Sequence, residues 1–101
     1  MEKNKISIVV PCFNEKEALP LFYNKITQVF NQMSQASETA ELSYELIIVD
    51  DGSMDGTLDV AKELAANDSG VKYISFSRNF GKEAAMYAGL QHAAGEYVAI
   101  M

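Results

Sequence analysis

An apolar run that ends in two adjacent carboxylates places the strongest constraint on the fold of this chain. Residues 45–57 read ELIIVDDGSMDGT, so a β-branched run is followed by Asp50 and Asp51, a glycine turn and the start of a helix. Buried strands of parallel sheets have this composition, and open α/β sheets bind ligands beyond the carboxyl ends of their strands. Similar transitions occur at residues 6–15 and 73–82. The sequence therefore predicts three polar loops at one edge of a parallel sheet, with a ligand site between them.

The rest of the chain alternates between strand-like and helix-like patterns. Short apolar runs predict strands at residues 5–10, 44–50, 71–77 and 97–101, and apolar residues at helical spacing predict helices at 17–35, 56–67 and 81–94. We expect Asp55 to cap the second helix and residues 34–43 to form a polar surface loop. Small residues would let the third helix lie close against the sheet; these are Ala84, Ala85, Ala88 and Gly89. Because strands that alternate with helices form parallel sheets, we predict one α/β domain.

Composition excludes several classes of protein. A length of 101 residues allows one domain, and a formal charge of −6 argues against a nucleic-acid-binding protein. The single cysteine, Cys12, cannot form an internal disulfide, which favours a reducing compartment. There is no secretory signal pattern, and no run approaches the roughly 18 apolar residues of a membrane span. We therefore expect a cytoplasmic domain.

The first predicted loop contains Pro11, Phe13, Asn14 and Glu15. Proline at the end of a strand fixes the turn and removes an N–H that no ladder would use. Asn14 and Glu15 would then lie at the rim, where a carboxylate can accept the hydroxyl groups of a ribose. Alternatively, Asn14 caps the following helix and Glu15 favours its positive end. The loop by itself supports both interpretations equally.

The second predicted loop contains Asp50, Asp51, Ser53 and Asp55. Two neighbouring carboxylates repel each other, and at a partly buried rim they destabilise the fold unless a donor or a cation uses them. A uracil imide N–H is one such donor, and a metal ion is another possible partner. In the alternative interpretation, the side chains only satisfy N–H groups of the turn. We expect both to hold, with Asp50 facing the ligand and residues 51–55 building the turn.

The third predicted loop carries two cations at the start of a helix. Arg78 and Asn79 precede Gly81 and Lys82, and the N–H groups of a helix start also favour anions. A diphosphate would fit this environment. The alternative is that both cations are solvated on an acidic surface. Their position at the third rim favours contact with a ligand.

Together these segments resemble the family 2 glycosyltransferases. The segments are VVPCFNE at residues 9–15, IIVDDGSMDGT at 47–57 and SRNFGKEAAMYAGLQHAAGEYV at 77–98, and in this order they cover nearly the whole chain. The resemblance is strongest to dolichol-phosphate mannosyltransferases and to bactoprenol (undecaprenyl-phosphate) sugar transferases. It implies the N-terminal, nucleotide-sugar-binding half of a GT-A fold. This half is a three-layer, Rossmann-like α/β unit with a parallel sheet of about four strands in the order 3-2-1-4 and helices on both faces.

The resemblance also assigns roles to residues. It implies that Pro11 and Glu15 line the nucleotide pocket, that Asp50 contacts the base and that residues 78–82 lie beside the nucleotide. With the loop arguments above, the predicted nucleotide site consists of Pro11, Phe13, Asn14, Glu15, Asp50, Asp51, Ser53, Arg78, Asn79, Gly81 and Lys82.

As an activity, the resemblance implies transfer of a sugar from a nucleotide sugar, a UDP-sugar, to a polyprenyl phosphate with inversion. Mg²⁺ or Mn²⁺ would stabilise the departing diphosphate. We expect no metal ligand or catalytic residue within residues 1–101, because the Asp-x-Asp motif of the family would follow Met101. The chain is therefore interpreted as one N-terminal subdomain, inactive alone, of a protein attached to the cytoplasmic face of a membrane. The strand at 97–101 is expected to mediate self-association.

Two other classes share part of this pattern. A phosphorylation-controlled receiver domain also has an acidic pair after a strand, but it needs a phosphoacceptor Asp where this chain has Ser77 and Arg78. A dinucleotide-binding oxidoreductase would have G-x-G-x-x-G after its first strand, and residues 11–15 contain no glycine. Both explain fewer of the loops than a transferase does.

Overall fold

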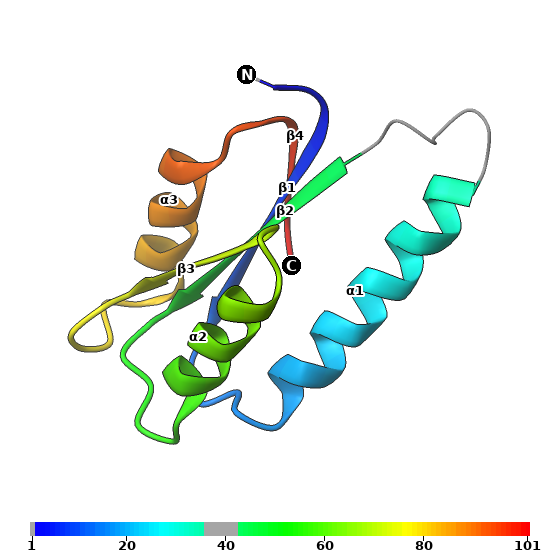
Figure 1. The fold of residues 1–101 in the computed structure, drawn as a ribbon. Coiled ribbons are helices and arrows are strands. Elements are labelled where there is room, and N and C mark those ends of the chain that lie inside the picture. The colour runs from blue at the N-terminus through cyan, green and yellow to red at the C-terminus, as the bar shows by residue number, and fades with distance from the viewer. Residues whose placement is uncertain (1, 36–42) are drawn as a thin grey trace.

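The computed structural model describes residues 2–35 and 43–101 and has the predicted order of strands and helices (Figure 1). The elements are β1 (Glu2–Cys12), α1 (Ala18–Gln35), β2 (Ser43–Asp50), α2 (Thr57–Asn67), β3 (Val71–Ser75), α3 (Lys82–His92) and β4 (Gly95–Ile100). Most of the loop expected at residues 34–43 lies outside the described residues. The α/β prediction is confirmed.

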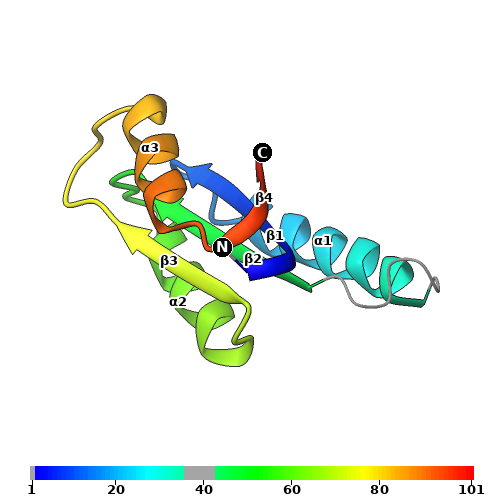
Figure 2. The ribbon, with the colours of Figure 1, turned by 90° about the horizontal axis from the view of Figure 1, so that it is seen from above.

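The sheet has four parallel strands in the order β3-β2-β1-β4. In the β1–β2 pair Val10 lies opposite Ile48, and in the β2–β3 pair Leu46 lies opposite Val71. Figure 2 shows α3 on one side of the sheet and α2 on the other. The predicted 3-2-1-4 order and the layered architecture are therefore confirmed. All the strand carboxyl ends lie at one edge.

Alternation along β1 and β2 divides the core between the two faces of the sheet. Even-numbered side chains of both strands pack with residues of α1 and α2; this cluster includes Ile8, Val10, Cys12, Leu46, Ile48, Leu19 and Ala61. Odd-numbered side chains pack with α3; this cluster includes Val9, Ile47, Val49 and Ala85. Because β2 is covered on both faces, its apolar run is continuous rather than alternating.

The third helix lies close to the sheet through its small residues, as predicted. Ala85 is fully buried, and a Cβ atom added to Gly89 would lie 2.2 Å from Cγ1 of Val9. Any larger side chain at residue 89 would therefore push α3 away from β1.

Several predicted boundaries are wrong, and one of them concerns a helix cap. Strand β1 continues through Pro11 to Cys12, and β3 ends at Ser75 rather than at residue 77. The N-cap of α2 is Gly56, with a φ of 93°, and not Asp55. Asp55 instead accepts hydrogen bonds from the backbone N–H of Thr57, at 3.0 Å, and from that of Lys16, at 3.2 Å. It therefore joins two loops as well as supporting the start of α2.

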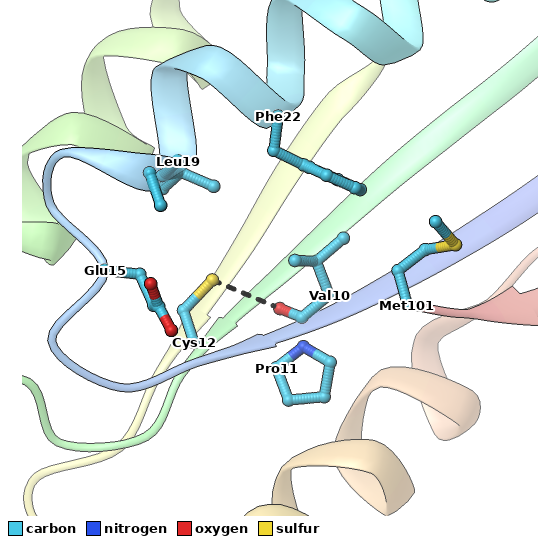
Figure 3. Close-up of a pocket in the computed structure, with 8 residues that line it drawn as sticks. Val10, Pro11, Cys12, Glu15, Leu19, Phe22 and Met101 are labelled. Atoms are coloured by element: carbon cyan, nitrogen blue, oxygen red, sulfur yellow. Dashed lines mark hydrogen bonds between the residues drawn. The ribbon is translucent and has the colours of Figure 1, made fainter.

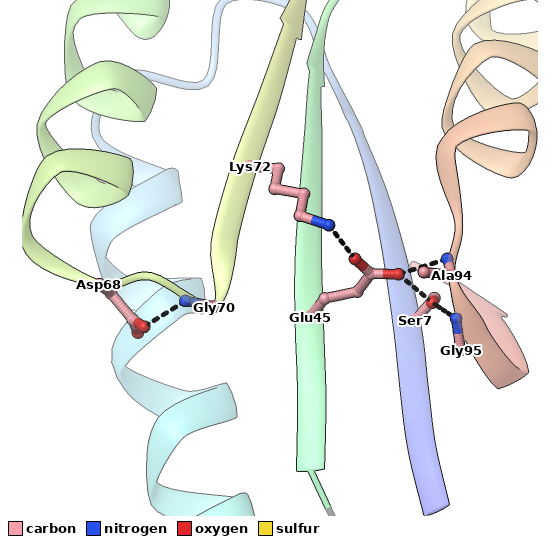
Figure 4. A network of polar contacts seen from close by, with 7 residues as sticks. All are labelled: Ser7, Glu45, Asp68, Gly70, Lys72, Ala94 and Gly95. Carbon is pink, nitrogen blue, oxygen red and sulfur yellow. Dashed lines mark hydrogen bonds and ion pairs between the residues drawn. The ribbon is translucent and has the colours of Figure 1, made fainter. Parts of the chain in front are cut away.

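A buried polar network connects the strands in their amino halves, far from the carboxyl edge (Figure 4). Glu45 is 1% exposed, and its carboxylate accepts hydrogen bonds from the Ser7 hydroxyl at 2.5 Å and the Ala94 N–H at 2.6 Å. Its other oxygen binds Lys72 Nζ at 2.7 Å, and Ser7 Oγ also accepts the Gly95 N–H at 2.8 Å. The network thus includes residues of every strand.

The same contacts determine the charge state of Glu45. Burial alone would favour the neutral acid, but hydrogen bonds from Lys72, Ser7 and the Ala94 N–H favour the carboxylate more strongly. They lower the pKa of Glu45 to about 2 from its ordinary 4.5. Glu45 is therefore a structural anion, although the sequence suggested only the start of an apolar strand.

Asp68 fixes the turn between α2 and β3 on the opposite side of the sheet. Its Oδ1 accepts the Gly70 N–H at 2.8 Å (Figure 4), and its Oδ2 accepts the Tyr23 hydroxyl at 2.6 Å. The hydrogen bond to this carboxylate, with burial, raises the pKa of Tyr23 to about 12. Helix α1 is thus held to the α2–β3 turn.

Candidate functional site

Three loops meet at the carboxyl edge of the sheet. The first loop comprises residues 13–17 after β1, the second loop 51–56 after β2, and the third loop 76–81 after β3. The hydrogen-bond ladder continues into them, because the Asp51 N–H donates to the Cys12 carbonyl at 2.8 Å and the Phe76 N–H donates to the Asp50 carbonyl at 2.9 Å. The predicted convergence of the three loops is therefore present.

The first and second loops are joined by a reciprocal pair of hydrogen bonds. The backbone N–H of Asn14, whose φ is 54°, donates to Ser53 Oγ at 2.8 Å. In return, Asn14 Oδ1 accepts the Met54 N–H at 2.9 Å. Asn14 does not cap α1, which begins at Ala18, so that alternative is wrong. The Asn14 Oδ1 and Ser53 Oγ atoms hold the loops together.

A second contact between these loops involves Thr57. Its hydroxyl accepts the Glu15 N–H at 2.9 Å, and Thr57 is fully buried. The Glu15 carboxylate itself has no hydrogen-bond partner within residues 2–35 and 43–101. The backbone of Glu15 is thus fixed, while its side chain remains available at the rim.

The second and third loops are joined by Asp51. Its Oδ1 accepts the Phe80 N–H at 2.8 Å, and its Oδ2 accepts the Gly81 N–H at 3.1 Å. Residues 51–55 were expected to build the second turn, but the carboxylate of Asp51 binds the third loop instead. Asp51 thereby occupies the N–H groups of Phe80 and Gly81, which precede the first residue of α3, so a diphosphate at the third loop would have to use other N–H groups.

Asp50 supports the turn and lines a groove at the same time. It is 2% exposed, and its Oδ1 accepts the Ser53 N–H at 3.2 Å. Its Oδ2 has no hydrogen-bond partner in the described part of the chain. Asp50 therefore supports the turn, a role that was expected of residues 51–55, and its contact with a ligand stays a prediction. Asp50 has one oxygen for the turn and one that remains unused.

Two of the grooves between the loops share a lining residue. The first groove, of about 360 Å³, is lined by Phe13, Asp50, Gly52, Ser53, Met54, Leu58, Ser75, Phe76, Ser77, Arg78 and Asn79. The second groove, of about 220 Å³, is lined by Pro11, Cys12, Phe13, Glu15, Asp51 and Lys82. Phe13 is 46% exposed and lines both, so the grooves adjoin at this residue.

The sequence prediction and the grooves agree on most residues. Asn14 and Gly81 line neither groove; each lies in a loop and forms the backbone contacts given above. Sequence patterns did not predict the apolar walls formed by Leu58 and Phe76, nor the contact that Thr57 makes between the loops. Phe76 lay inside a predicted strand, so no local signal indicated that the strand would end at Ser75.

Two cations stand at the grooves without counter-ions. Arg78 and Lys82 are exposed, and neither forms an ion pair with any described residue. The Arg78 guanidinium lies 4.8 Å from the centre of the Phe80 ring, which holds its side chain over the third loop. In a chain of net charge −6, this is a local environment suited to an anion.

An apolar pocket of about 180 Å³ adjoins the second groove (Figure 3). Pro11, Cys12 and Glu15 line both, and the pocket is completed by Val10, Ala18, Leu19, Phe22 and Met101. Burial, together with the nearby carboxylates of Glu15 and Asp50, raises the pKa of the Cys12 thiol to about 12. The thiol donates to the Val10 carbonyl at 3.7 Å, so Cys12 is an inert part of the wall.

Neither a metal cluster nor a membrane helix is found among residues 2–35 and 43–101. No group of three or more His, Cys, Asp or Glu side chains there could hold a metal ion. None of the helices in this part of the chain is both long and apolar enough to cross a membrane.

Comparison with known proteins identifies the family. The sequence model described as Glycosyl transferase family 2 matches residues 7–101. The chain belongs to glycosyl transferase family 2. The family resemblance carried by the three loop motifs is thereby confirmed.

Curated relatives and solved structures agree with this assignment. The chain is 44% identical to the bactoprenol glucosyl transferase of Shigella phage SfV, over 93% of this chain and 28% of that protein. It is 35% identical to the undecaprenyl-phosphate 4-deoxy-4-formamido-L-arabinose transferase of Aeromonas hydrophila, over 92% and 27%. It resembles a mannosyltransferase from Pyrobaculum calidifontis solved with GDP-Man and Mn²⁺, with a TM-score of 0.66 and 25% identity over 92% of this chain and 25% of that one. The chain spans about a quarter of the length of these relatives.

Proposed function

We propose that the complete protein transfers a sugar from a nucleotide sugar to a polyprenyl phosphate with inversion at the anomeric carbon. Residues 1–101 would be its N-terminal nucleotide-binding subdomain, acting on the cytoplasmic side of the membrane. Family membership and the names of the bactoprenol and undecaprenyl-phosphate relatives support the reaction and the acceptor. The solved relative with GDP-Man supports a nucleotide sugar as donor.

One observation carries the proposal. The two grooves adjoin at Phe13, one containing an unused carboxylate oxygen of Asp50 and the other containing Glu15 and the unpaired cation Lys82. A nucleoside diphosphate has matching parts in the same order: a base with N–H donors, a ribose diol and an anionic diphosphate.

These parts can be assigned to residues by their chemistry. The base would occupy the first groove, stacked against Phe13 and donating an imide N–H to Asp50 Oδ2. The ribose hydroxyls would donate to the Glu15 carboxylate. The diphosphate would extend toward Lys82 in the second groove, with Arg78 adding positive charge at the mouth of the first. An imide N–H is present in uracil and absent from cytosine, so among the pyrimidines we propose uracil and hence a UDP-sugar; the titration with GDP below tests guanine, which also carries ring N–H donors.

In the proposed reaction, a phosphate oxygen of the acceptor forms a bond to the anomeric carbon while the bond to the nucleoside diphosphate breaks on the opposite side. The residues of this chain bind and orient the nucleotide, so that the sugar is held in a fixed position relative to the acceptor. We propose Mg²⁺ or Mn²⁺ for the complete protein, where it would neutralise the leaving diphosphate. By the family resemblance, its ligands would come from an Asp-x-Asp motif beyond residue 101.

Calorimetric titration of the chain with UDP, UDP-glucose, CDP, GDP and ADP tests the nucleotide site. We expect weak binding of the uridine nucleotides and weaker or no binding of the others. For the reaction, the full-length protein in membranes is incubated with labelled UDP-glucose and undecaprenyl phosphate. Transfer of label to the lipid is expected from the full-length protein and not from residues 1–101 alone. Equal affinity for all nucleotides would contradict the assignment of the base.

We also propose that the chain self-associates through β4. Its apolar side chains are largely exposed, namely Tyr97, Val98, Ile100 and the adjoining Met101, and among the described strands it pairs only with β1. Sedimentation at increasing concentration should show a dimer or larger species. A monomer at all concentrations would contradict this proposal.

A further inference from the structure

We propose that Asp51 is a positioning residue for the nucleotide. Its carboxylate fixes the third loop, and this holds Arg78 at the first groove and Lys82 at the second. The inference rests on the proposed function, because it concerns the affinity of the same site.

Both carboxylate oxygens of Asp51 already have hydrogen-bond partners within the protein. Asp51 is 4% exposed, and both carboxylate oxygens accept backbone N–H groups of the third loop, from Phe80 and Gly81. Its carbonyl accepts the Asn79 side-chain amide at 3.3 Å, and its own N–H continues the ladder to Cys12. Asp51 therefore connects the end of β1 to the three residues that lie between Arg78 and Lys82.

Gly52 provides independent evidence that the second and third loops fit closely. A Cβ atom at this residue, whose φ is 74°, would lie 2.3 Å from the Arg78 carbonyl carbon and 2.4 Å from the Asn79 nitrogen. The backbone of the third loop therefore lies directly on the second loop. Asp51 forms hydrogen bonds to the third loop, and the absence of a side chain at residue 52 lets the third loop approach the second loop closely.

This arrangement has an electrostatic consequence that can be measured. The N–H groups at a helix start ordinarily favour anions, but the two that directly precede Lys82 at the start of α3, those of Phe80 and Gly81, are occupied by a protein carboxylate. Asp51 also lines the second groove together with Lys82. By charge alone, removal of Asp51 would strengthen the binding of a diphosphate, because a nearby negative charge is lost and the N–H groups become free. If Asp51 acts by positioning, its removal should instead weaken the binding of a diphosphate, because Arg78 and Lys82 would no longer be held at the grooves.

The test compares the UDP affinity of the wild-type chain with that of Asp51→Asn and Asp51→Ala, by calorimetry. We expect about tenfold weaker binding in Asp51→Ala and a smaller loss in Asp51→Asn, which keeps one acceptor. Formate, a small carboxylate, is added to Asp51→Ala at increasing concentration, with sodium chloride at equal ionic strength as the reference. Recovery of UDP affinity with formate alone is expected, because formate can replace the missing acceptor.

The control variant is Ser7→Ala, which removes a donor to the buried Glu45 at the other end of the sheet. It should lower stability but leave UDP affinity unchanged, which separates positioning from a general loss of stability. Amide hydrogen exchange, without nucleotide, should show protection of Phe80 and Gly81 in the wild type and its loss in Asp51→Ala.

The outcomes separate this inference from the proposed function. Unchanged or tighter UDP binding in both Asp51 variants overturns the inference alone, as does fast exchange of the two amides in the wild type. If the wild type binds no nucleotide, the proposed function fails, and the exchange data still decide whether Asp51 holds the third loop.

Discussion

Gly89 of α3 lies against Val9 of β1 so closely that no side chain fits between helix and strand. We therefore predict that Gly89→Ala destabilises the fold by about 1–3 kcal/mol, although alanine is the better helix former by up to about 1 kcal/mol. Urea denaturation at neutral pH measures the change. Gln91→Ala, at an exposed position of the same helix, is the matched control and should be neutral. Equal stability of the two variants would show that α3 lies farther from the sheet than the structure indicates.

Glu45 should make the stability of the fold depend on pH in the acid range. Its pKa is about 2 in the folded state and about 4.5 ordinarily, so its contribution is complete above pH 4.5 and is lost as the pH falls toward 2. The loss amounts to at most about 3 kcal/mol. The urea midpoint, measured from pH 6 down to pH 2, should decrease more steeply in the wild type than in Glu45→Gln. Parallel profiles for the two proteins would exclude Glu45 as the source.

Asp50 should determine which pyrimidine the site accepts. Asp50→Asn keeps an oxygen for the Ser53 N–H, but it replaces the unused acceptor by an amide donor. We expect UDP binding to weaken by about tenfold, because a uracil imide N–H would then face another donor. CDP, whose ring nitrogen accepts at that position, should gain affinity relative to UDP. Titration of both nucleotides into both proteins gives the ratio; an unchanged ratio would mean that the base does not contact Asp50.

Lys82 should contribute to the binding of the diphosphate and not of the nucleoside. In Lys82→Met we expect UDP affinity to fall roughly threefold, since the side chain is exposed and screened by solvent, whereas uridine affinity stays the same. Lys62→Met changes the net charge equally at an exposed position of α2 and should affect neither ligand. Added salt should reduce the difference between the wild type and Lys82→Met. A similar loss in Lys62→Met would indicate a general charge effect.

Cys12 should be protected from thiol reagents in the folded chain. Because burial raises its pKa to about 12, almost no thiolate is present at pH 8, and the side chain is only 3% exposed. The rate of labelling by an aromatic disulfide reagent should therefore follow unfolding, rising with urea across the denaturation transition. Rapid labelling without urea would place Cys12 at an accessible surface instead.

Local patterns predict the parts of this fold that depend on neighbouring residues. The continuous β-branched run before Asp50 identifies a strand covered on both faces, and small residues identify the close approach of α3. The order of the strands, by contrast, cannot be predicted from local patterns. It follows from the family resemblance, because alternating strands and helices are compatible with several parallel orders.

The contacts that organise the site could not be predicted in this way. Asp51 binds N–H groups about thirty residues away, and Asn14 pairs with Ser53 across the loops. Such partners exist only once the sheet has brought the carboxyl ends together, so spacing along the chain carries no signal for them. The identity of the loops was therefore predictable, but the division of work between Asp50 and Asp51 was not.

The Glu45 network and the loops lie at opposite ends of the same strands. A substitution in one region is therefore expected to have little effect on the structure of the other, because only the strands connect them. Relatives with different donor preferences could diverge at the loops while retaining the same scaffold. Conversely, a chain with a weakened scaffold could be repaired around Ser7 and Glu45 without altering its choice of nucleotide.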